Sequence, residues 1–176
     1  SIISKGTTLS AANIDKSWLN FDAENFFRNE LKANLRLIND ADAAGIAELQ
    51  YGAAKGVMGT VILLTLGTGI GSAIFLDGKL VPNTELGHLK YKKSIAEHYA
   101  ANSARENKNL KYSEWGKELE DVLIHIEKLF SPELFILGGG ISKKFEKFGK
   151  YLTKVRANVV PAEMKNEAGI IGAAMA

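Results

Sequence analysis

The sequence predicts an α/β fold, in which strands and helices alternate along the chain. Two apolar runs, residues 61–66 and 133–137, have the length of buried strands, and each ends at a cluster of glycines. Residues 113–130 instead carry apolar side chains at helical spacing, which predicts one long amphipathic helix. A chain of 176 residues with 46% hydrophobic content can bury the core of one domain or of parts of two.

Composition narrows the class of protein. The net charge of +2 is too close to neutrality to indicate a nucleic-acid or membrane partner, and we expect neither. The absence of cysteine excludes disulfides and any zinc or iron-sulfur site held by cysteine. No apolar run approaches the ~18 residues of a membrane span, and the first residues lack the layout of a signal peptide. We therefore expect a soluble, cytoplasmic protein.

The first part of the chain carries weak patterns. Residues 1–20 show no clear periodicity and are expected to form a loop, with residues 17–21 as a candidate short strand. Asp22 suits the N-cap of a helix that runs to about residue 33, because Phe and Leu recur at helical spacing there. Residues 35–38 have the apolar character of a short buried strand.

A second helix is predicted from Asp40 to the stop at residues 55–56, with small alanines on one face that would let it lie close to a sheet. Asp40 and Asp42 stand at its N-terminus, where the helix dipole favours negative charge. They either cap the helix or place a carboxylate at the mouth of a cleft, and only one of the two need be functional.

The most informative stretch is residues 61–81, a strand, a glycine loop and a second strand that ends in an Asp-Gly turn. Its G-x-G-x-G spacing is followed by a strand, so it is not the dinucleotide fingerprint, and the chain contains no P-loop motif. Glycine backbone can approach an anion closely and offer N–H groups to it. We interpret it as a hairpin that binds phosphate, and an ordinary glycine-rich turn is the alternative. The candidate phosphate-binding residues are Gly67, Thr68, Gly69 and Gly71.

Residues 82–88 are a loop that places Glu85 and His88 three positions apart. This pair offers donors and acceptors suited to the hydroxyl groups of a sugar ring. A metal site is a weak alternative, because no third ligand is near, and a solvated surface loop is the other. A polar helix is predicted over residues 94–107.

The strand at 133–137 ends in Gly138, Gly139 and Gly140, followed by a predicted lysine-rich helical segment at 143–154. Exposed N–H groups at such a junction favour an anion, and a tight turn between strand and helix is the alternative. The lysines usually indicate a solvated helix face.

Four segments, residues 39–44, 66–71, 85–88 and 137–142, together resemble the ROK family of sugar kinases and sugar-responsive repressors. The resemblance runs from about Ser10 to the end of the chain. The fuller phrases NDADAAG, PNTE-x-GH and SPELFI-x-GGG resemble the polyphosphate glucokinases within that family. Those enzymes also lack the cysteine-rich zinc motif that many ROK members carry after the G-H element, so no zinc is expected.

The family also begins with an aspartate and a glycine-rich phosphate loop that nothing in this sequence matches. The resemblance therefore implies a fragment, nearly inactive by itself, with the actin-like ATPase, ribonuclease-H-like α/β fold. Residues 1–39 would be the C-terminal part of the first, small domain and residues 40–176 the second, large domain. The final helix, 168–176, is a candidate to return to the first domain.

For function, the resemblance implies a glucokinase that transfers a phosphoryl group from polyphosphate or ATP to the 6-hydroxyl of glucose. It assigns the catalytic base to Asp40, glucose binding to Asn39, Glu85 and His88, donor phosphates to the hairpin glycines and Thr68, and the nucleotide to Gly138–Gly140. Mg²⁺ is expected to bridge the donor oxygens, the lysines at 90–93 and 143–154 are candidates for a polyphosphate groove, and a homodimer is expected. A sugar-sensing ROK repressor domain and a nucleotide-binding module of another actin-like protein are the alternatives.

Overall fold

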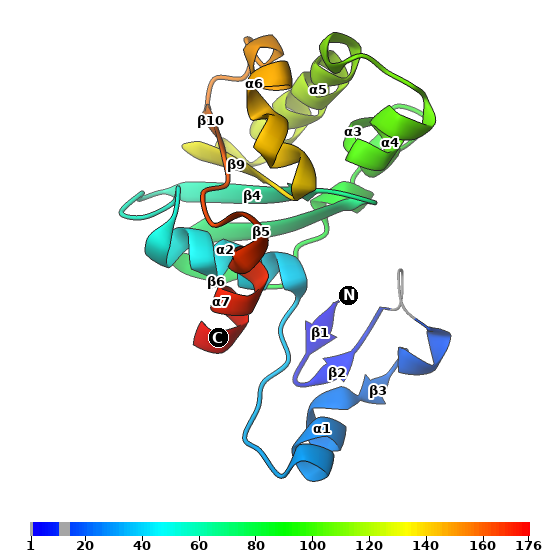
Figure 1. Ribbon diagram of the computed structural model, residues 1–176, viewed down its shortest axis with the longest axis vertical. Helices are drawn as coiled ribbons and strands as arrows, with labels where there is room; N and C mark the ends of the chain where they lie inside the picture. The colour runs from blue at the N-terminus through cyan, green and yellow to red at the C-terminus, as the bar shows by residue number, and fades with distance from the viewer. Residues whose placement is uncertain (1, 11–14) are drawn as a thin grey trace.

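The computed structural model describes residues 2–10 and 15–176 (Figure 1). Its centre is a five-stranded sheet in the order β10-β9-β4-β5-β6, in which β4, β9 and β10 are parallel, β5 runs antiparallel to β4, and β6 runs antiparallel to β5. The strand bounds are Thr60–Leu66 (β4), Ile70–Leu76 (β5), Lys79–Val81 (β6), Leu134–Gly138 (β9) and Asn158–Pro161 (β10). The predicted α/β class and both predicted glycine-terminated strands are confirmed.

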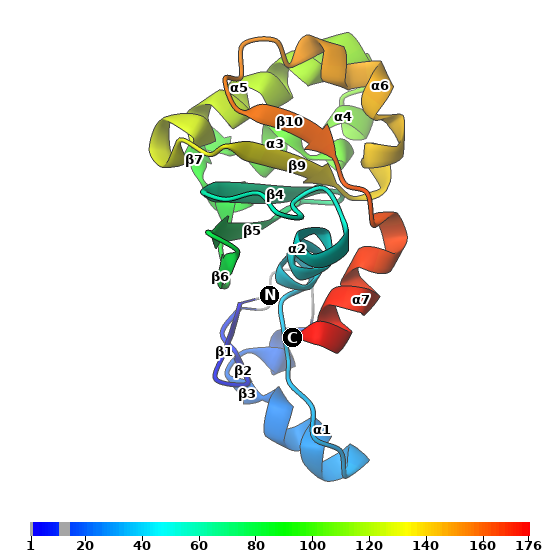
Figure 2. The same ribbon diagram turned by 90° about the vertical axis from the view of Figure 1, so that its left-hand side faces the viewer.

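Helices cover both faces of this sheet, as Figure 2 shows. One face carries the long helix α5 (Tyr112–Phe130) together with α6 (Phe145–Phe148), and the short helices α3 (Glu97–Ala100) and α4 (Asn102–Asn107) lie beside α5. The other face carries α2 (Asp40–Tyr51) and α7 (Ala168–Met175), which pack along each other. The two helices approach so closely that a Cβ on Gly172 would lie 1.6 Å from the carbonyl oxygen of Ala43.

Strand β4 divides the apolar core into two parts because successive side chains point to opposite faces. Ile62, Leu64 and Leu66 join the buried cluster under α5, which includes Trp115, Leu119 and Leu123. Val61 and Leu63 join the second cluster, which includes Phe75 and Ile136 and packs against apolar side chains of α2. Burial of β4 on both faces explains why its sequence is a continuous apolar run rather than an alternating one.

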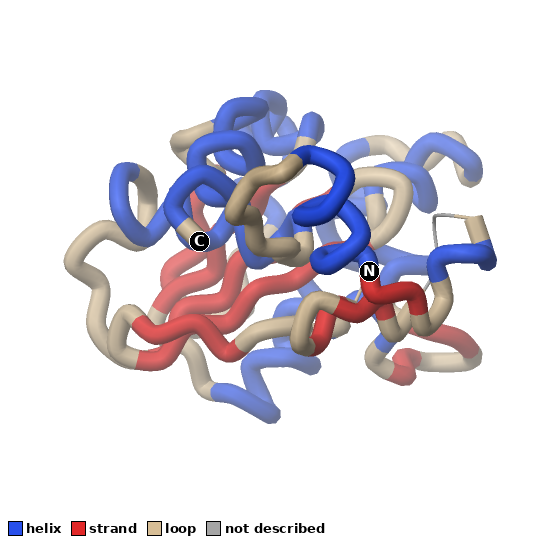
Figure 3. Tube along the Cα trace, turned by 90° about the horizontal axis from the view of Figure 1, so that it is seen from below, coloured by secondary structure: helices blue, strands red, loops and turns tan. Residues whose placement is uncertain are grey.

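The N-terminal part forms a separate three-stranded antiparallel sheet with one helix, and Figure 3 shows its strands apart from those of the large sheet. Its elements are β1 (Ile3–Ser4), β2 (Thr7–Thr8), the 3-10 turn η1 (Lys16–Trp18), β3 (Phe21–Asp22) and α1 (Ala23–Leu31). Asp22 caps α1 as predicted, through a hydrogen bond from the Asn25 N–H.

Two expectations for this part are wrong. Residues 1–20 are not all loop, because Lys5 and Gly6, both with positive φ, join β1 and β2 into a hairpin too short to show periodicity; residues 1 and 11–14 lie outside the described residues. Residues 35–38 are not a strand. The carbonyl of Leu35 accepts a hydrogen bond from the Arg28 guanidinium and the N–H of Leu37 donates to Glu24, so side chains of α1 take the place of a neighbouring strand.

The helix predicted over residues 94–107 is broken. It begins after the short strands β7 (Lys90–Tyr91) and β8 (Ser94–Ile95) and divides at Ala101, whose backbone is extended, into α3 and α4. The indole N–H of Trp115 donates to the carbonyl of Ala100 at 3.2 Å, which helps to hold this break in the core.

The lysine-rich segment is likewise not one helix but a series of short turns, η3 (Gly140–Lys144), α6 and η4 (Gly149–Tyr151), followed by the unexpected strand β10. Two further 3-10 turns are η2 (Leu86–His88) and η5 (Lys165–Glu167). Within residues 2–10 and 15–176, helices of the length and apolarity required to cross a bilayer are absent.

Candidate active site

The N-terminus of α2 separates its two acidic residues. Asn39 is the N-cap, and its side-chain oxygen accepts the N–H groups of Ala41 and Asp42 at 2.8 and 3.1 Å. This cap leaves Asp40, the first residue of the helix, exposed to solvent, whereas Asp42 is buried with 1% of its surface accessible. Of the two carboxyl groups, only that of Asp40 is accessible to a ligand.

Asp42 has an internal role. One of its oxygens accepts the N–H of Asn83 at 2.9 Å, and the other has no hydrogen-bond partner among the described residues. Burial raises the pKa of Asp42, and the negative charges of Asp40 and Glu85 act in the same direction against the opposing Asn83 hydrogen bond. Asn83 also exchanges two hydrogen bonds with the main chain of Ile3, so this pair connects the large sheet to β1.

Glycines bring α2 close to the hairpin between β4 and β5. A Cβ on Gly71 would lie 2.6 Å from the hydroxyl of Thr65 and 3.1 Å from the Cβ of Ala41. The first turn of α2, which carries Asp40, can therefore rest against the start of β5 only because position 71 has no side chain.

The loop after β6 is fixed by a buried serine. The Ser72 hydroxyl donates to the carbonyl of Thr84 at 2.8 Å and accepts the N–H of Leu86 at 3.0 Å. Gly87 packs so tightly that a Cβ there would be 2.3 Å from the carbonyl oxygen of Ile70. These contacts place Glu85 and His88 at the end of β5 nearest the hairpin.

His88 lies between two carboxyl groups. Its Nδ1 is 3.6 Å from Glu85, and its Nε2 is 3.8 Å from Glu97. Glu97 also accepts the N–H of Ile70 at 3.1 Å, so it connects the imidazole to the glycine hairpin. Glu97 was not predicted as a site residue, because an acidic residue in the first turn of a helix is also expected simply from its favourable interaction with the helix dipole.

The third glycine segment reaches the same region from β9. Gly139 has φ +82°, and a Cβ on it would lie 2.7 Å from the carbonyl oxygen of Leu66, at the end of β4. Gly138 pairs with Thr65 inside the sheet, and Gly140 opens η3.

These elements enclose a cavity of about 750 Å³, lined by residues from both sheets. Most predicted site residues line it: Asn39, Asp40, Gly67, Thr68, Gly69, Gly71, Glu85, His88 and Gly139. Gly138 and Gly140 are adjacent in the chain but do not line it, and Glu97, Thr65 and Ser10 do. The volume is in the range of cavities that bind small molecules.

In the part of the chain that the structure describes, no group of three or more His, Cys, Asp or Glu side chains is arranged to bind a metal ion.

Comparison with known proteins identifies the family of the chain. The ROK family model matches residues 1–100. Polyphosphate glucokinase of Mycobacterium tuberculosis is 48% identical over 176 residues, and the match spans 99% of this chain and 66% of the relative, so the chain covers slightly less than two thirds of that protein.

Solved structures show the same fold. The inorganic polyphosphate/ATP-glucomannokinase from Arthrobacter sp. strain KM matches with a TM-score of 0.94 and 53% identity, over 99% of this chain and 68% of that one. A ROK family glucokinase from Streptomyces griseus in complex with glucose and AMPPNP matches with a TM-score of 0.80 over 97% of this chain and 76% of that one; at 24% identity it shows the fold alone. The chain therefore has the actin-like α/β fold of these kinases, and it belongs to the ROK family.

Proposed function

We propose that the intact protein is a glucokinase that transfers a phosphoryl group from polyphosphate or ATP to the 6-hydroxyl group of glucose. The observation that carries the proposal is one cavity that joins an exposed carboxyl group, Asp40, to the glycine hairpin and to the Glu85 and His88 pair. The names of the M. tuberculosis and Arthrobacter relatives support the same activity. We also propose residues 1–39 and 40–176 as parts of two domains with the cleft between them.

Phosphoryl transfer requires alignment and charge neutralisation more than covalent chemistry. Asp40 would accept the proton of the sugar 6-hydroxyl as the new phosphorus–oxygen bond forms. The N–H groups of the hairpin and the hydroxyl of Thr68 would hold oxygens of the donor. This division of roles follows the geometry, because the hairpin and α2 meet at Gly71.

Other side chains of the cavity would bind the remaining hydroxyl groups of the sugar. Asn39, Glu85, His88 and Glu97 line the same cavity, and together they supply donors and acceptors for several hydroxyl groups. A sugar that lacks a matching hydroxyl would leave one of these groups unpaired, which is the physical basis of rejection. Glucose is the proposed substrate, and mannose is the comparison that tests selectivity.

Mg²⁺ fits this cavity as an ion that would enter bound to the phosphates of the phosphoryl donor. It favours phosphate and water ligands supplemented by one or two carboxylates rather than a protein cage, and the described residues offer no such cage. Asp40 is the exposed carboxyl group beside the hairpin that could contribute. The ion would neutralise charge on the donor phosphates.

Not all of the lysines proposed for the polyphosphate groove are free to bind a donor. Lys92 is paired with Glu118 at 2.7 Å and lies over the ring of Tyr91, so its charge is already engaged. Lys143 and Lys144 are exposed in η3, directly after the glycines that reach the cavity. We propose these two lysines as the part of the groove nearest the donor.

Replacing Asp40 with Asn tests the function. Turnover with glucose and either donor should fall by about 10²–10⁴-fold, the usual contribution of a general base, while glucose affinity measured by calorimetry is retained. Asp77→Asn is the matched control, because Asp77 is exposed in the β5–β6 turn, away from the cavity. Unchanged turnover in Asp40→Asn would refute the base assignment. A wild-type protein that binds glucose but phosphorylates no sugar would instead support the repressor-type sensor.

A further inference from the structure

The tip of the glycine hairpin, residues 67–69, has an unusual hydrogen-bond arrangement. The carbonyl of Gly67 accepts the main-chain N–H of Ser103 at 3.1 Å, and the carbonyl of Thr68 accepts the hydroxyl of the same serine at 2.5 Å. The carbonyl of Gly69 accepts the N–H of Gly67 at 3.0 Å. All three carbonyl groups of the tip are therefore bound, two of them to one residue of α4.

The N–H groups of the tip are used differently. That of Gly67 is bound within the tip, and that of the following Ile70 donates to Glu97. The N–H groups of Thr68 and Gly69 have no hydrogen-bond partner anywhere in residues 2–10 and 15–176. Two adjacent free amides at an accessible turn are an arrangement that can bind an oxyanion.

The two observations are linked by the peptide bond. A trans peptide unit is planar, and its C=O and N–H point in opposite directions. The unit that contains the Gly67 carbonyl also contains the Thr68 N–H, and the unit that contains the Thr68 carbonyl also contains the Gly69 N–H. Ser103 thus binds the carbonyl of both units whose N–H groups are free, and it directs both N–H groups away from α4.

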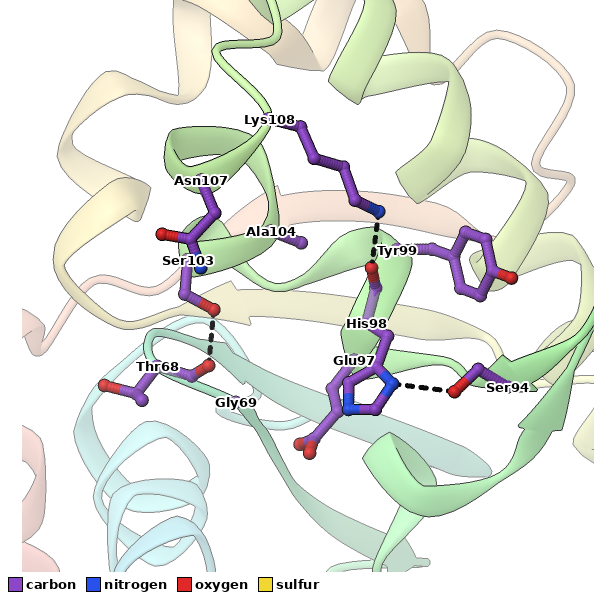
Figure 4. Close-up of a pocket in the computed structure, with 10 residues that line it drawn as sticks. All are labelled: Thr68, Gly69, Ser94, Glu97, His98, Tyr99, Ser103, Ala104, Asn107 and Lys108. Carbon is purple, nitrogen blue, oxygen red and sulfur yellow. Dashed lines mark hydrogen bonds between the residues drawn. The ribbon is translucent and has the colours of Figure 1, made fainter.

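The two cavities beside the hairpin show on which side of the tip Ser103 lies. Figure 4 shows Ser103 on α4 above the tip, with its hydroxyl bound to the Thr68 carbonyl, in a second cavity of about 520 Å³ behind the hairpin. Thr68 and Gly69 line this cavity and also the one that contains Asp40, so the tip is a wall between the two. Ser103 acts from the rear side, and it does not line the front cavity.

Packing restrains part of the tip only weakly, since Gly67 has no neighbouring atom within 4 Å of where its Cβ would be. Glycine also permits many backbone conformations, and rotation of either peptide unit would replace a donor by a carbonyl oxygen that repels the anion. At the neighbouring positions, Glu97 accepts the N–H of Ile70, and a Cβ on Gly69 would be 2.5 Å from its carboxyl oxygen.

We propose that Ser103 is a positioning residue for phosphoryl transfer, which fixes the two peptide units of the hairpin tip so that the Thr68 and Gly69 amides face the donor phosphate. This proposal rests on the proposed function, because it names the donor as the anion. Ser103 itself touches neither sugar nor donor.

The test compares Ser103→Ala, Ser103→Thr and the control Asn107→Ala in the intact protein. Asn107 lies on the same helix and lines the same rear cavity but makes no hydrogen bond to the hairpin. Ser103→Ala keeps the main-chain bond to Gly67 and loses the bond to Thr68. We expect kcat/KM for polyphosphate and ATP to fall about tenfold, less than the loss of a whole oxyanion donor, with the glucose dissociation constant unchanged. Ser103→Thr, which retains the hydroxyl, should restore most of the activity.

A binding measurement separates this proposal from the proposed function. Calorimetry with tripolyphosphate and Mg²⁺ should show weaker binding to Ser103→Ala than to the wild type or Asn107→Ala, whether or not the protein phosphorylates glucose. Equal tripolyphosphate affinity and equal donor kinetics in Ser103→Ala and Asn107→Ala would overturn the proposal. A parallel loss of glucose affinity would also overturn it, since that would indicate general loosening. If Ser103→Ala does not fold, Ser103→Cys, whose thiol is a weaker hydrogen-bond donor than the hydroxyl, takes its place in both measurements.

Discussion

Glu48 offers a sharp test of how the last part of the chain is held in place. Its side chain is fully buried near the end of α2. One carboxyl oxygen accepts the N–H of Met164 at 2.7 Å and the other accepts the N–H of Ala53 at 2.8 Å. Because Met164 lies between β10 and α7, the first of these bonds connects α2 to the segment before α7, 116 residues later in the sequence.

The cost of removing this side chain can be estimated from its two bonds. Glu48→Ala leaves both N–H groups without their partner. A fully buried unsatisfied donor costs about 1–3 kcal/mol, and because these two bonds are only partly buried, the loss should lie at the lower end of about 2–6 kcal/mol. Glu48→Gln keeps one acceptor oxygen and turns an NH₂ group toward the other N–H, so about half of that loss is expected. A loss of this size is large relative to the ~5–15 kcal/mol that stabilises a typical domain.

Urea unfolding of the intact protein measures the change, and Gln50→Ala is the control because Gln50 is exposed on the same helix. Hydrogen exchange supplies a second readout. Amides of α7 should exchange faster in Glu48→Ala than in the wild type, whereas the exchange of amides in α5, which Glu48 does not contact, should not change. A free energy of unfolding within about 0.5 kcal/mol of that of Gln50→Ala would show that these bonds do not hold the segment.

Two further predictions concern the dependence of stability on pH. Because burial raises the pKa of Asp42, the folded state binds its proton more readily than the unfolded state, and the contribution of this group falls as the pH rises above its ordinary value of 3.8. Asp42→Asn, which keeps an oxygen for the Asn83 N–H, should therefore be at least as stable as the wild type at pH 7 and lose this advantage near pH 4; a uniform destabilisation across that range would contradict the prediction. For Glu127, burial would raise the pKa, but the N–H groups of Ala157 and Arg156 and the Arg156 guanidinium together lower it below 4.5. Glu127→Gln should be less stable than the wild type at pH 7, with a difference in denaturation midpoint that narrows as the pH falls below 4.5, and a difference independent of pH would refute the assignment.

Local patterns were sufficient where a segment is stabilised mostly by its own sequence. The apolar stripe of residues 113–130 became α5, and the hairpin with its Asp-Gly turn became β4, β5 and β6. Asp22 marks a helix start as predicted, because capping is a contact between residues two or three positions apart, and the helix predicted from Asp40 begins there with Asn39 as its cap. The family resemblance then supplied the order of the site segments, which periodicity by itself did not.

Long-range contacts decided the rest. The break at Ala101 lies beside two long-range hydrogen bonds, from Trp115 to the carbonyl of Ala100 and from Ser103 to the carbonyl of Thr68. Trp115 and Thr68 lie outside residues 94–107, so the pattern within that segment could not indicate the break. Residues 35–38 have the composition of a strand, but their main chain forms hydrogen bonds with side chains of α1 and not with a neighbouring strand. Strand β10 was missed because its pairing with β9 depends on tertiary packing rather than on an apolar run.

The sequence by itself determined the secondary structure of the long apolar segments, the glycine clusters and the identity of the polar groups that follow them. Only the tertiary structure decided that Asp40 is exposed while Asp42 is buried, that Glu97 lies beside His88, and that Ser103 binds the hairpin tip. The physical reason is range. Propensity and capping act within a few residues, whereas accessibility and the direction of a peptide unit depend on which distant element packs against it.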